Sequence, residues 1–545
     1  MSLLGFGCAA NSGGNGGSGG QTGSGGSSSG SGGSNGSGGS NSGSGGKASS
    51  GGSTASGGSG SGGSASGGSS GSGGSTGSGG TATTGSGGKG SGGSTGSGGS
   101  ATTGSGGQSN GGSTGSGGSA TGSGGAGMTA SCTFTPTSST STKIPTVGIV
   151  TFSTTLTSPT SAHIDFGLTT SYGMTAPVDL TQKDYRTLLL GMKASKMYHY
   201  RIVASNSTGD CTGPDATIMT GALTNGLPKI SVSTKDATKL YGGFLITGQY
   251  AQNAGTSGSP AFILDGDGDI VWWYSISSDV TGARMTYDGK AMWINGANVP
   301  SGTVHVHRVT MDGVTDEDHS SEFVGQNHQM TILPDETVAF YGYGSNGCDD
   351  IKERAPNGTV KTIVNARTAH GGTGACHVNT IQYSKSDDTL IFSDLDNQDL
   401  TKVTRTGTTV WVLNGTGNTF TGDSWKGGEH GLHIIAADDL LIFNNNSTTG
   451  GGTGKGSMAI EMKIDATAKT AMKIWSYTSS PTVQNDVMGD VERLPNGNTV
   501  IGYSTKGVYD EVDSGGTLLQ RLSWPLGASF GYIEKRATLY GPPPK

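Results

Sequence analysis

Three histidines in the second half of the chain each stand immediately before a strand-like hairpin of the same pattern. They are His328, His377 and His430. Because the positions are equivalent in successive copies, we expect the imidazoles to meet at one end of a central channel. Three imidazoles in one pocket are costly to desolvate unless they serve a function. An imidazole can bind a metal, hold an oxyanion as its protonated form, or act as a nucleophile.

Two other patterns resemble metal sites more weakly. The acidic run Asp265–Asp269 alternates Asp with Gly, but the twelfth position of an EF-hand loop, which needs Glu, is Ile276. An acidic hairpin turn is the better interpretation. His305 and His307 share one face of an expected strand, but no third ligand is apparent, which favours a polar strand face. We therefore predict no metal and no cofactor.

The elements that position the three histidines belong to a repeat that begins near Pro228. Each copy is a strand, a tight turn rich in Asp, Asn and Gly, and a second apolar strand. The turns recur every ~50 residues, a period typical of propeller blades. The clear copies are Arg284–Trp293, Met330–Phe340, Ile381–Phe392, Ile434–Phe443 and Val491–Ile501. Further hairpins end near Trp272 and Trp411, so residues 228–541 predict a six-bladed β-propeller of four-stranded blades.

Residues 128–222 predict a separate β-sandwich. The stretches Val147–Phe152, Ser161–Gly167 and Met197–Val203 alternate apolar and polar residues, and turn residues separate them at sandwich-like intervals. The corner Gly191–Tyr200 resembles the one that precedes a late strand of fibronectin type III domains. The whole chain is therefore expected to be all-β. A spacer or binding role suits the sandwich, since its only histidines lie within strand patterns.

The repeat region as a whole resembles the bacterial arylsulfotransferases, which are exported six-bladed propellers. The resemblance lies in the three histidines before their hairpins. It extends through Leu333–Asp335, Asp350–Glu353, Asp388–Ile391, Leu441–Asn445 and Leu494–Asn498. This family moves a sulfuryl group from an aryl sulfate to a phenol without a nucleotide, through a sulfohistidine. The resemblance implies His430 as nucleophile and His328 and His377 as the supporting pair. The neighbouring His433 leaves the choice of nucleophile open.

One stretch departs from the family pattern. After the second histidine the family usually carries an Arg that neutralises the transferring sulfate, whereas Ile391–Asn397 here is acidic and contains Asp394. A carboxylate that faced the sulfate would repel it. Lys426 and Arg367 are the candidates for a replacement cation. With Asn379, which follows His377 in the matching motif, they are the expected substrate-binding residues.

Five cysteines indicate the compartment. Cys132 and Cys211 flank the first globular segment, while Cys348 and Cys376 lie in the second. Two such pairs are typical of disulfides in an oxidising compartment, although the sequence does not fix the connectivity and free buried thiols are the alternative. The fifth, Cys8, follows Leu and small residues, as at the end of a bacterial lipoprotein signal peptide. We predict lipidation of Cys8, with residues 1–8 as the signal remnant.

Between this cysteine and the sandwich lies a low-complexity arm. Residues 9–127 consist almost entirely of Gly, Ser, Thr, Ala and Asn, and their only charges are Lys47 and Lys89. Such a segment cannot bury enough apolar surface to fold, so a disordered tether is expected. The prediction is an extracytoplasmic, lipid-anchored protein, in the periplasm or at the outer cell surface. No apolar run is long enough to span a membrane as a helix.

The expected partners are therefore small aryl sulfates and phenols, with membrane contact through the anchor only. A net charge of −7 without basic clusters argues against nucleic acid as a partner. Two alternatives remain open. The first is a non-catalytic propeller that binds a glycan, a phenolic ligand or a protein. The second, a metal-dependent hydrolase built on the three histidines, is weaker because no carboxylate partner stands beside each histidine.

Overall fold

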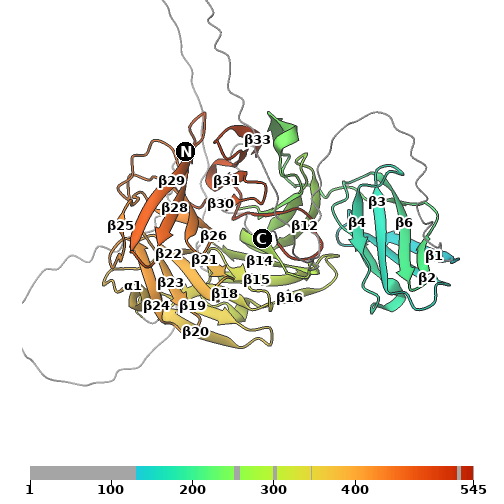
Figure 1. The fold of residues 1–545 in the computed structure, drawn as a ribbon, viewed down its shortest axis with the longest axis horizontal. Coiled ribbons are helices and arrows are strands. Elements are labelled where there is room, and N and C mark those ends of the chain that lie inside the picture. The colour runs from blue at the N-terminus through green and yellow to red at the C-terminus, as the bar shows by residue number, and fades with distance from the viewer. Residues whose placement is uncertain (1–130, 251–257, 299–302, 345, 525–528, 544–545) are drawn as a thin grey trace, which may run out of the picture. The chain divides into compact units, whose positions relative to one another are not determined.

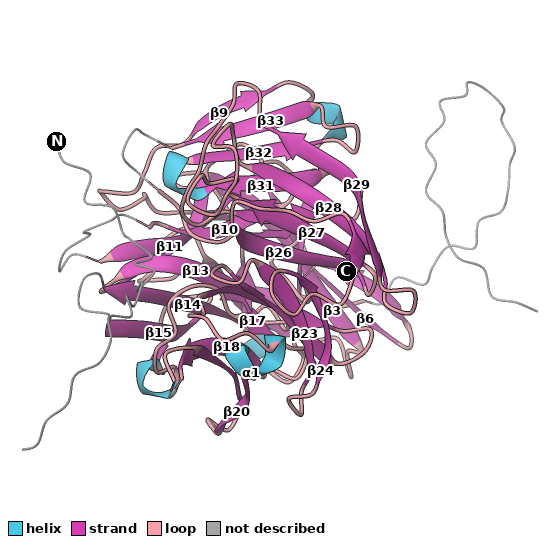
Figure 2. Ribbon diagram, turned by 90° about the vertical axis from the view of Figure 1, so that its left-hand side faces the viewer, coloured by secondary structure: helices cyan, strands magenta, loops and turns pink. Residues whose placement is uncertain are grey.

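The computed structural model describes residues 131–250, 258–298, 303–344, 346–524 and 529–543. The predicted signal remnant, Cys8 and the Gly/Ser arm lie outside this range. Apart from a few short helical turns, the regular secondary structure of the described residues consists of strands (Figures 1 and 2), which confirms the all-β prediction. Within these segments, no helix combines the length and the hydropathy needed to cross a membrane.

The first described segment forms two antiparallel sheets that share a core. One sheet contains β1 (Phe134–Thr140), β2 (Gly148–Thr154) and β5 (Thr187–Leu189). The other contains β4 (Met174–Pro177), β3 (Ser161–Gly167), β6 (Met197–Asn206), β7 (Gly209–Thr212) and β8 (Ala216–Met219). A disulfide joins Cys132 to Cys211. The Tyr198 hydroxyl accepts a hydrogen bond from the Lys193 N–H at 2.8 Å, which ties β6 to the loop before it.

Six further sheets form the blades of the propeller. Blades 1 to 3 comprise β34 (Glu534–Arg536), β10 (Phe244–Gly248), β11 (Ser259–Leu264) and β12 (Ile270–Ile276); β13 (Asp279–Met285), β14 (Ala291–Asn298), β15 (Thr303–Thr310) and β16 (Asp316–Asp318); and β17 (Thr331–Ile332), β18 (Val338–Tyr343), β19 (Asp349–Arg354) and β20 (Val360–Asn365). The propeller therefore has the six blades that the sequence predicts.

Blades 4 to 6 continue the same order from the innermost strand outward. They comprise β21 (Val378–Ser384), β22 (Thr389–Asp394), β23 (Asp399–Thr404) and β24 (Thr409–Asn414); β26 (Glu429–Ala436), β27 (Asp439–Asn444), β28 (Met458–Asp465), β29 (Thr470–Thr478) and β25 (Thr421–Gly422); and β30 (Asp490–Arg493), β31 (Thr499–Tyr503), β32 (Val508–Val512), β33 (Leu518–Ser523) and β9 (Ser231–Thr234).

Both ends of the propeller region close the ring. The C-terminal strand β34 pairs with β10 of blade 1, and the early strand β9 pairs with β33 of blade 6. The C-terminal strand β34 thus completes blade 1, the first blade of the region. In the same way, the early strand β9 completes blade 6, the last one. The turns inside the hairpins follow the expected chemistry. In the turn between β13 and β14, Gly289 has a φ of +71°, a conformation that favours glycine.

The two weaker metal patterns prove to be paired polar groups. The Nζ atom of Lys193 lies 2.7 to 3.1 Å from a carboxylate oxygen of each of Asp265, Asp267 and Asp269, so an ammonium group occupies the centre of the acidic turn. On β15, the Nδ1 atom of His307 lies 2.8 Å from Oδ1 of Asp316. Both interpretations, an acidic turn and a polar strand face, agree with these contacts.

Candidate functional site

Three imidazoles meet where the inner strands of blades 3, 4 and 5 begin. The ring centroids of His328 and His377 are 5.2 Å apart, and those of His328 and His430 are 5.9 Å apart. His328 precedes β17, His377 directly precedes β21, and His430 is the second residue of β26. The shared position in the repeat is what brings residues so far apart in sequence into one cluster.

The protonation pattern of His430 follows from its neighbour Asn445. The Nδ1 atom of His430 lies 2.6 Å from Oδ1 of Asn445. The amide nitrogen of Asn445 donates to the carbonyls of Asn485 and Met488, so its oxygen must face the ring as an acceptor. His430 therefore carries its hydrogen on Nδ1. The lone pair is on Nε2, the atom that is left for chemistry.

Burial keeps His430 and His328 neutral. His430 is only 3% exposed, and burial lowers its pKa to about 3. Burial and the two neighbouring imidazoles likewise lower the pKa of His328 well below its usual value. The Nδ1 atom of His328 lies 2.5 Å from Oδ1 of Asn327, in the same arrangement as at His430. A neutral, hydrogen-bonded imidazole is a competent nucleophile near pH 7.

His433 belongs to a different environment although it lies on the same strand. Its Nδ1 atom accepts a hydrogen bond of 2.8 Å from the backbone N–H of Arg493. Its Nε2 atom must therefore carry the ring hydrogen. The one lone pair of the neutral ring, on Nδ1, is already used by the Arg493 N–H, so none is left to attack a substrate. Burial, with Arg493 and Arg284 nearby, lowers its pKa to about 4. Between these two histidines the geometry favours His430 as the nucleophile.

The backbone around His377 is held by groups from two blades. Its N–H donates to Oδ1 of Asp394 at 3.0 Å, and its carbonyl accepts from Leu395 at 2.8 Å. The next N–H, that of Val378, donates to Oδ2 of Asp349 at 3.0 Å. A disulfide joins the preceding Cys376 to Cys348 in blade 3. His377 is thus anchored on both sides, so the cluster needs little reorganisation to keep its geometry.

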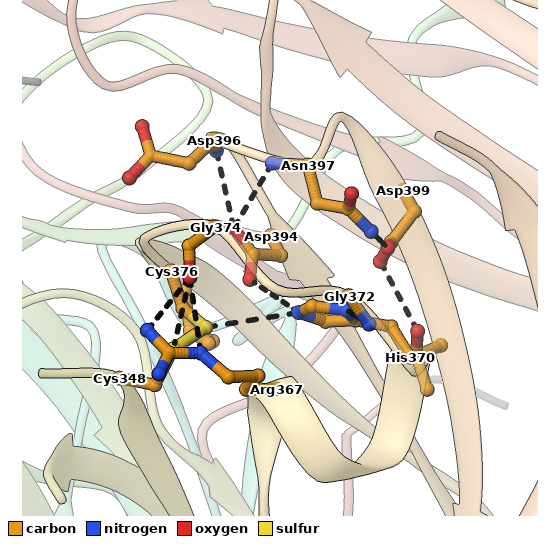
Figure 3. A network of polar contacts seen from close by, with 12 residues as sticks. Cys348, Arg367, His370, Gly372, Gly374, Cys376, Asp394, Asp396, Asn397 and Asp399 are labelled. Carbon is orange, nitrogen blue, oxygen red and sulfur yellow. Dashed lines mark hydrogen bonds and ion pairs between the residues drawn. A yellow bond between two sulfur atoms is a disulfide. The ribbon is translucent and has the colours of Figure 1, made fainter. Parts of the chain in front are cut away.

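The carboxylate of Asp394 turns toward backbone N–H groups. It therefore does not take the position, facing a bound sulfate, in which the acidic stretch would repel the substrate. Its Oδ1 also accepts the N–H groups of Asp396 and Asn397 at 3.1 and 3.3 Å, and its side chain is fully buried (Figure 3). Its Oδ2 lies 3.2 Å from Nε2 of His370, the last residue of the short helix α1 (Ala366–His370). The carboxylate therefore organises the turn that presents His377.

His370, Cys376 and Asp394 lie close enough together to resemble a metal site. The Nδ1 atom of His370 accepts the Gly372 N–H at 2.9 Å, so the hydrogen is on Nε2 and points toward Asp394 (Figure 3). A metal ion bound to Nε2 would require the ring hydrogen to be on Nδ1. There it would point at the Gly372 N–H and break that hydrogen bond. The Cys376 sulfur is also committed to the disulfide. These groups suit a structural network and not a metal centre.

The predicted substrate-binding residues lie in different environments. The Arg367 guanidinium donates twice to the Gly374 carbonyl, at 3.0 and 2.7 Å (Figure 3). Lys426 is exposed on the loop before β26, and its carbonyl accepts from Asn444. Asn379 is fully buried, and its amide donates to the Glu429 carbonyl at 2.7 Å. The guanidinium of Arg367 is thus held at a backbone carbonyl and not at the three imidazoles.

A pocket of about 460 Å³ opens beside His377. Its wall contains Tyr343, which is 67% exposed, and the disulfide between Cys348 and Cys376. Asp349 and Asn327, the residue before His328, also line it. An exposed aromatic ring next to an imidazole cluster offers a stacking surface for an aryl group. Sequence reasoning missed Asn445, Asp349 and Tyr343. Only Asn445 carried a signal, because it stands at the end of a family-like stretch.

Comparison with known proteins supports one family. Residues 349–524 match the family model described as Arylsulfotransferase (ASST). The match runs from β19 to β33 and contains His377 and His430, while His328 lies before it. No curated protein matches the chain.

Similar solved structures include TolB from Acinetobacter baumannii, at 12% identity and a TM-score of 0.39, covering 63% of this chain and 80% of that one. Another is a streptogramin B lyase, at 12% identity and a TM-score of 0.35, covering 56% and 98%. A third is the calcium-binding protein regucalcin from Agrobacterium tumefaciens, at 13% identity and a TM-score of 0.32, covering 53% and 93%. Scores this low carry no argument about the chemistry of the site.

Proposed function

We propose that the propeller transfers a sulfuryl group from an aryl sulfate to a phenol, with His430 as the covalent nucleophile. The observation that carries this proposal is the contact between His430 and Asn445, which leaves a neutral Nε2 lone pair within a cluster of imidazoles. The match of residues 349–524 to an arylsulfotransferase model supports the same chemistry. No cofactor is needed, because the donor ester already contains the group that moves.

The first half-reaction forms a sulfohistidine. The Nε2 lone pair of His430 attacks the sulfur, the N–S bond forms, and the bond from sulfur to the aryl oxygen breaks. Asn445 keeps the Nδ1 hydrogen and stabilises the positive charge that develops on the ring. The departing phenolate takes a proton from a neighbouring protonated imidazole and leaves as a phenol.

The second half-reaction reverses these events with another phenol. The now neutral neighbouring imidazole removes the phenol's proton, and the phenol oxygen attacks the sulfur. The N–S bond breaks, its electron pair returns to Nε2 of His430, and a new aryl sulfate leaves. Two displacements through one covalent intermediate allow ping-pong exchange between aryl groups. The pocket beside Tyr343 is the proposed place for the aryl ring.

Incubation with 4-nitrophenyl sulfate and a phenol acceptor tests this function. We expect release of nitrophenol and, without acceptor, one SO₃ group on the peptide that contains His430, detected by mass spectrometry. His430→Ala should lose both signals, whereas the matched variant His433→Ala should keep the modified peptide. Absence of nitrophenol release and of the modification would reject the proposal. Aryl sulfate binding that survives in His430→Ala would then favour a non-catalytic binding propeller.

We also propose that Cys8 is lipidated and anchors the protein outside the cytoplasm. The two disulfides of the described residues support an oxidising compartment. Expression of the wild type and of Cys8→Ser with a labelled fatty acid tests the anchor. The label and membrane association should be present in the wild type and absent from the variant. A wild type that carries no label would refute the anchor without affecting the enzymatic proposal.

A further inference from the structure

The pocket beside the imidazole cluster is larger than a bare phenol requires. Its volume of about 460 Å³ lies in the range of pockets that bind drug-sized molecules. A phenol whose oxygen is at the imidazoles and whose ring stacks on Tyr343 leaves space for a substituent on the far side of the ring. The groups that line this remaining space therefore determine which phenols fit.

The lining of the pocket is unbalanced in charge. Among its described residues, Asp349 supplies the only carboxylate, and there is neither a lysine nor an arginine. Asp349 is the first residue of β19, and burial raises its pKa to about 6, which still leaves it ionised at pH 7. Its Oδ2 accepts the Val378 N–H at 3.0 Å. A backbone N–H carries no formal charge, so this bond holds the carboxylate at the wall without neutralising it.

A second carboxylate lies behind the same wall. A β-carbon at Gly344, which lines the pocket, would come within 2.5 Å of Oδ1 of Asp350. That oxygen accepts a hydrogen bond from the Asn365 amide at 2.8 Å, again from a neutral group. The Lys352 ammonium is directed to the Tyr343 carbonyl, at 3.4 Å. This side of the pocket therefore presents a negative potential to whatever occupies it.

We propose that the pocket selects phenols that carry a positively charged substituent, with Asp349 as the residue that sets this preference. An ammonium group on a short side chain pairs with Asp349 while the phenol oxygen is at the imidazoles. A carboxylate in the same position would be repelled, and it would meet no lysine or arginine among the described residues of the lining. This inference rests on the proposed function and names its substrate class.

The same charge also orients the substrate. A phenol with an ammonium side chain that enters in reverse brings its cation to the neutral rings of His328 and His430 and leaves Asp349 without a partner. The productive orientation pairs the two charges and brings the hydroxyl to the imidazoles. Asp349 thus acts on the ring substituent, whereas the sulfuryl group binds at the other end of the substrate. Its contribution is to selection and positioning and not to the chemical step.

Three acceptors of similar shape test the preference. Tyramine, 4-ethylphenol and 3-(4-hydroxyphenyl)propanoate end in an ammonium, a methyl and a carboxylate group. With 4-nitrophenyl sulfate as donor at pH 7 and low salt, kcat/KM should fall in that order. Tyramine should exceed the propanoate about tenfold, because a partly exposed ion pair and the corresponding repulsion each change binding by about two- to fivefold.

Asp349→Asn should bring the three kcat/KM values close together. The amide oxygen can still accept the Val378 N–H, so the wall keeps its shape. The matched control is Asp335→Asn, in the turn between β17 and β18 at the opposite end of β18 from Tyr343, which should keep the wild-type order. Salt provides a readout that needs no variant. The preference should shrink between ~0.01 and ~1 M salt, because the Debye length falls from about 30 to about 3 Å.

Isothermal titration calorimetry with the same three phenols, without a donor, separates this inference from the function on which it rests. Tighter binding of tyramine that depends on Asp349, in a protein that transfers no sulfuryl group, would refute the proposed function alone. Transfer to all three acceptors with equal kcat/KM in the wild type would refute this inference alone. A preference for tyramine that persists in Asp349→Asn would also overturn it, since another group would then supply the charge.

Discussion

Oδ1 of Asn445 lies 2.6 Å from Nδ1 of His430, and both hydrogens of the Asn445 amide are used by backbone carbonyls. The side chain therefore cannot turn its nitrogen toward the ring without losing two hydrogen bonds. A residue outside the substrate pocket thus selects which nitrogen of the histidine carries the lone pair. This contact connects the residue that follows β27 to the reactive atom of the proposed site.

Replacing Asn445 should slow catalysis without weakening substrate binding. In Asn445→Ala the His430 ring can place its hydrogen on either nitrogen, and the charge on the sulfated ring loses its acceptor. We expect kcat to fall by at least about tenfold, equivalent to ~1.4 kcal/mol, with KM unchanged. Steady-state kinetics measures both. The ¹⁵N signals of His430 should show a mixture of tautomers, and a pure Nδ1–H pattern in the variant would contradict the mechanism.

The two disulfides should differ in their effect on activity. Cys348–Cys376 joins blades 3 and 4 directly beside His377, whereas Cys132–Cys211 lies in the sandwich. Opening either loop, of 28 or 79 residues, should cost roughly 3.5 to 4.5 kcal/mol of unfolding free energy. Only Cys348→Ser/Cys376→Ser should lower kcat, because only that bridge holds the pocket wall.

The control for this comparison is Cys132→Ser/Cys211→Ser, which should unfold more readily and keep the wild-type kcat at temperatures where it stays folded. Denaturation curves and initial rates, taken on the same samples, separate the two effects. Equal losses of kcat in both pairs would show that the Cys348–Cys376 bridge has no special relation to His377.

The propeller could be predicted because its signal is local and repeated. Turns such as Asp288–Gly289 require particular backbone conformations, and the apolar strands on either side alternate with a fixed period. The closing strand β34 could not be predicted in this way, since its three residues carry no repeat signature. Its place depends on pairing with β10, which lies at the other end of the propeller region.

The positions of the site histidines followed from the repeat, but the direction of the polar groups around them did not. The acidic stretch raises the concern that Asp394 faces a sulfate, yet its carboxylate turns to three N–H groups and to His370. The direction that such a side chain takes depends on which backbone N–H groups a turn leaves without an acceptor. The order of residues in the sequence does not reveal this. For the same reason, the Arg367 guanidinium donates to a carbonyl four positions beyond its helix.

The acidic network behind the site should make stability depend on pH. Asp399 is fully buried, and burial together with Asp394 raises its pKa to about 7. Between pH 4 and 7 the folded state therefore binds more protons than the unfolded state, and the unfolding free energy falls as the pH rises. The contribution is complete below the unfolded pKa and is lost as the pH passes through the folded pKa.

Asp399→Asn should remove this dependence. The full shift corresponds to a loss on the order of 4 kcal/mol between pH 4 and 7, so the variant should be more stable than the wild type at pH 7 and similar to it at pH 4. Denaturant unfolding followed by tryptophan fluorescence at several pH values measures the slope. The exposed Asp486→Asn serves as the control and should leave the slope unchanged. If Asp399→Asn leaves the pH dependence of the unfolding free energy unchanged, another titratable group must be responsible for it.

Tyr343 should govern the binding of the aryl group and not the chemical step. Its ring is 67% exposed and lines the pocket beside His377, where it can stack on the substrate before either displacement occurs. An aromatic pair contributes roughly 0.5 to 1.5 kcal/mol beyond the area that it buries. Tyr343→Ala should therefore raise KM for an aryl sulfate about 2- to 10-fold while kcat stays the same, since the ring is equally engaged in ground and transition states. Tyr343→Phe keeps the ring and should retain the wild-type KM, and steady-state kinetics with 4-nitrophenyl sulfate compares all three proteins. If Tyr343→Ala binds the ester as well as the wild type does, the aryl group must occupy another part of the channel mouth.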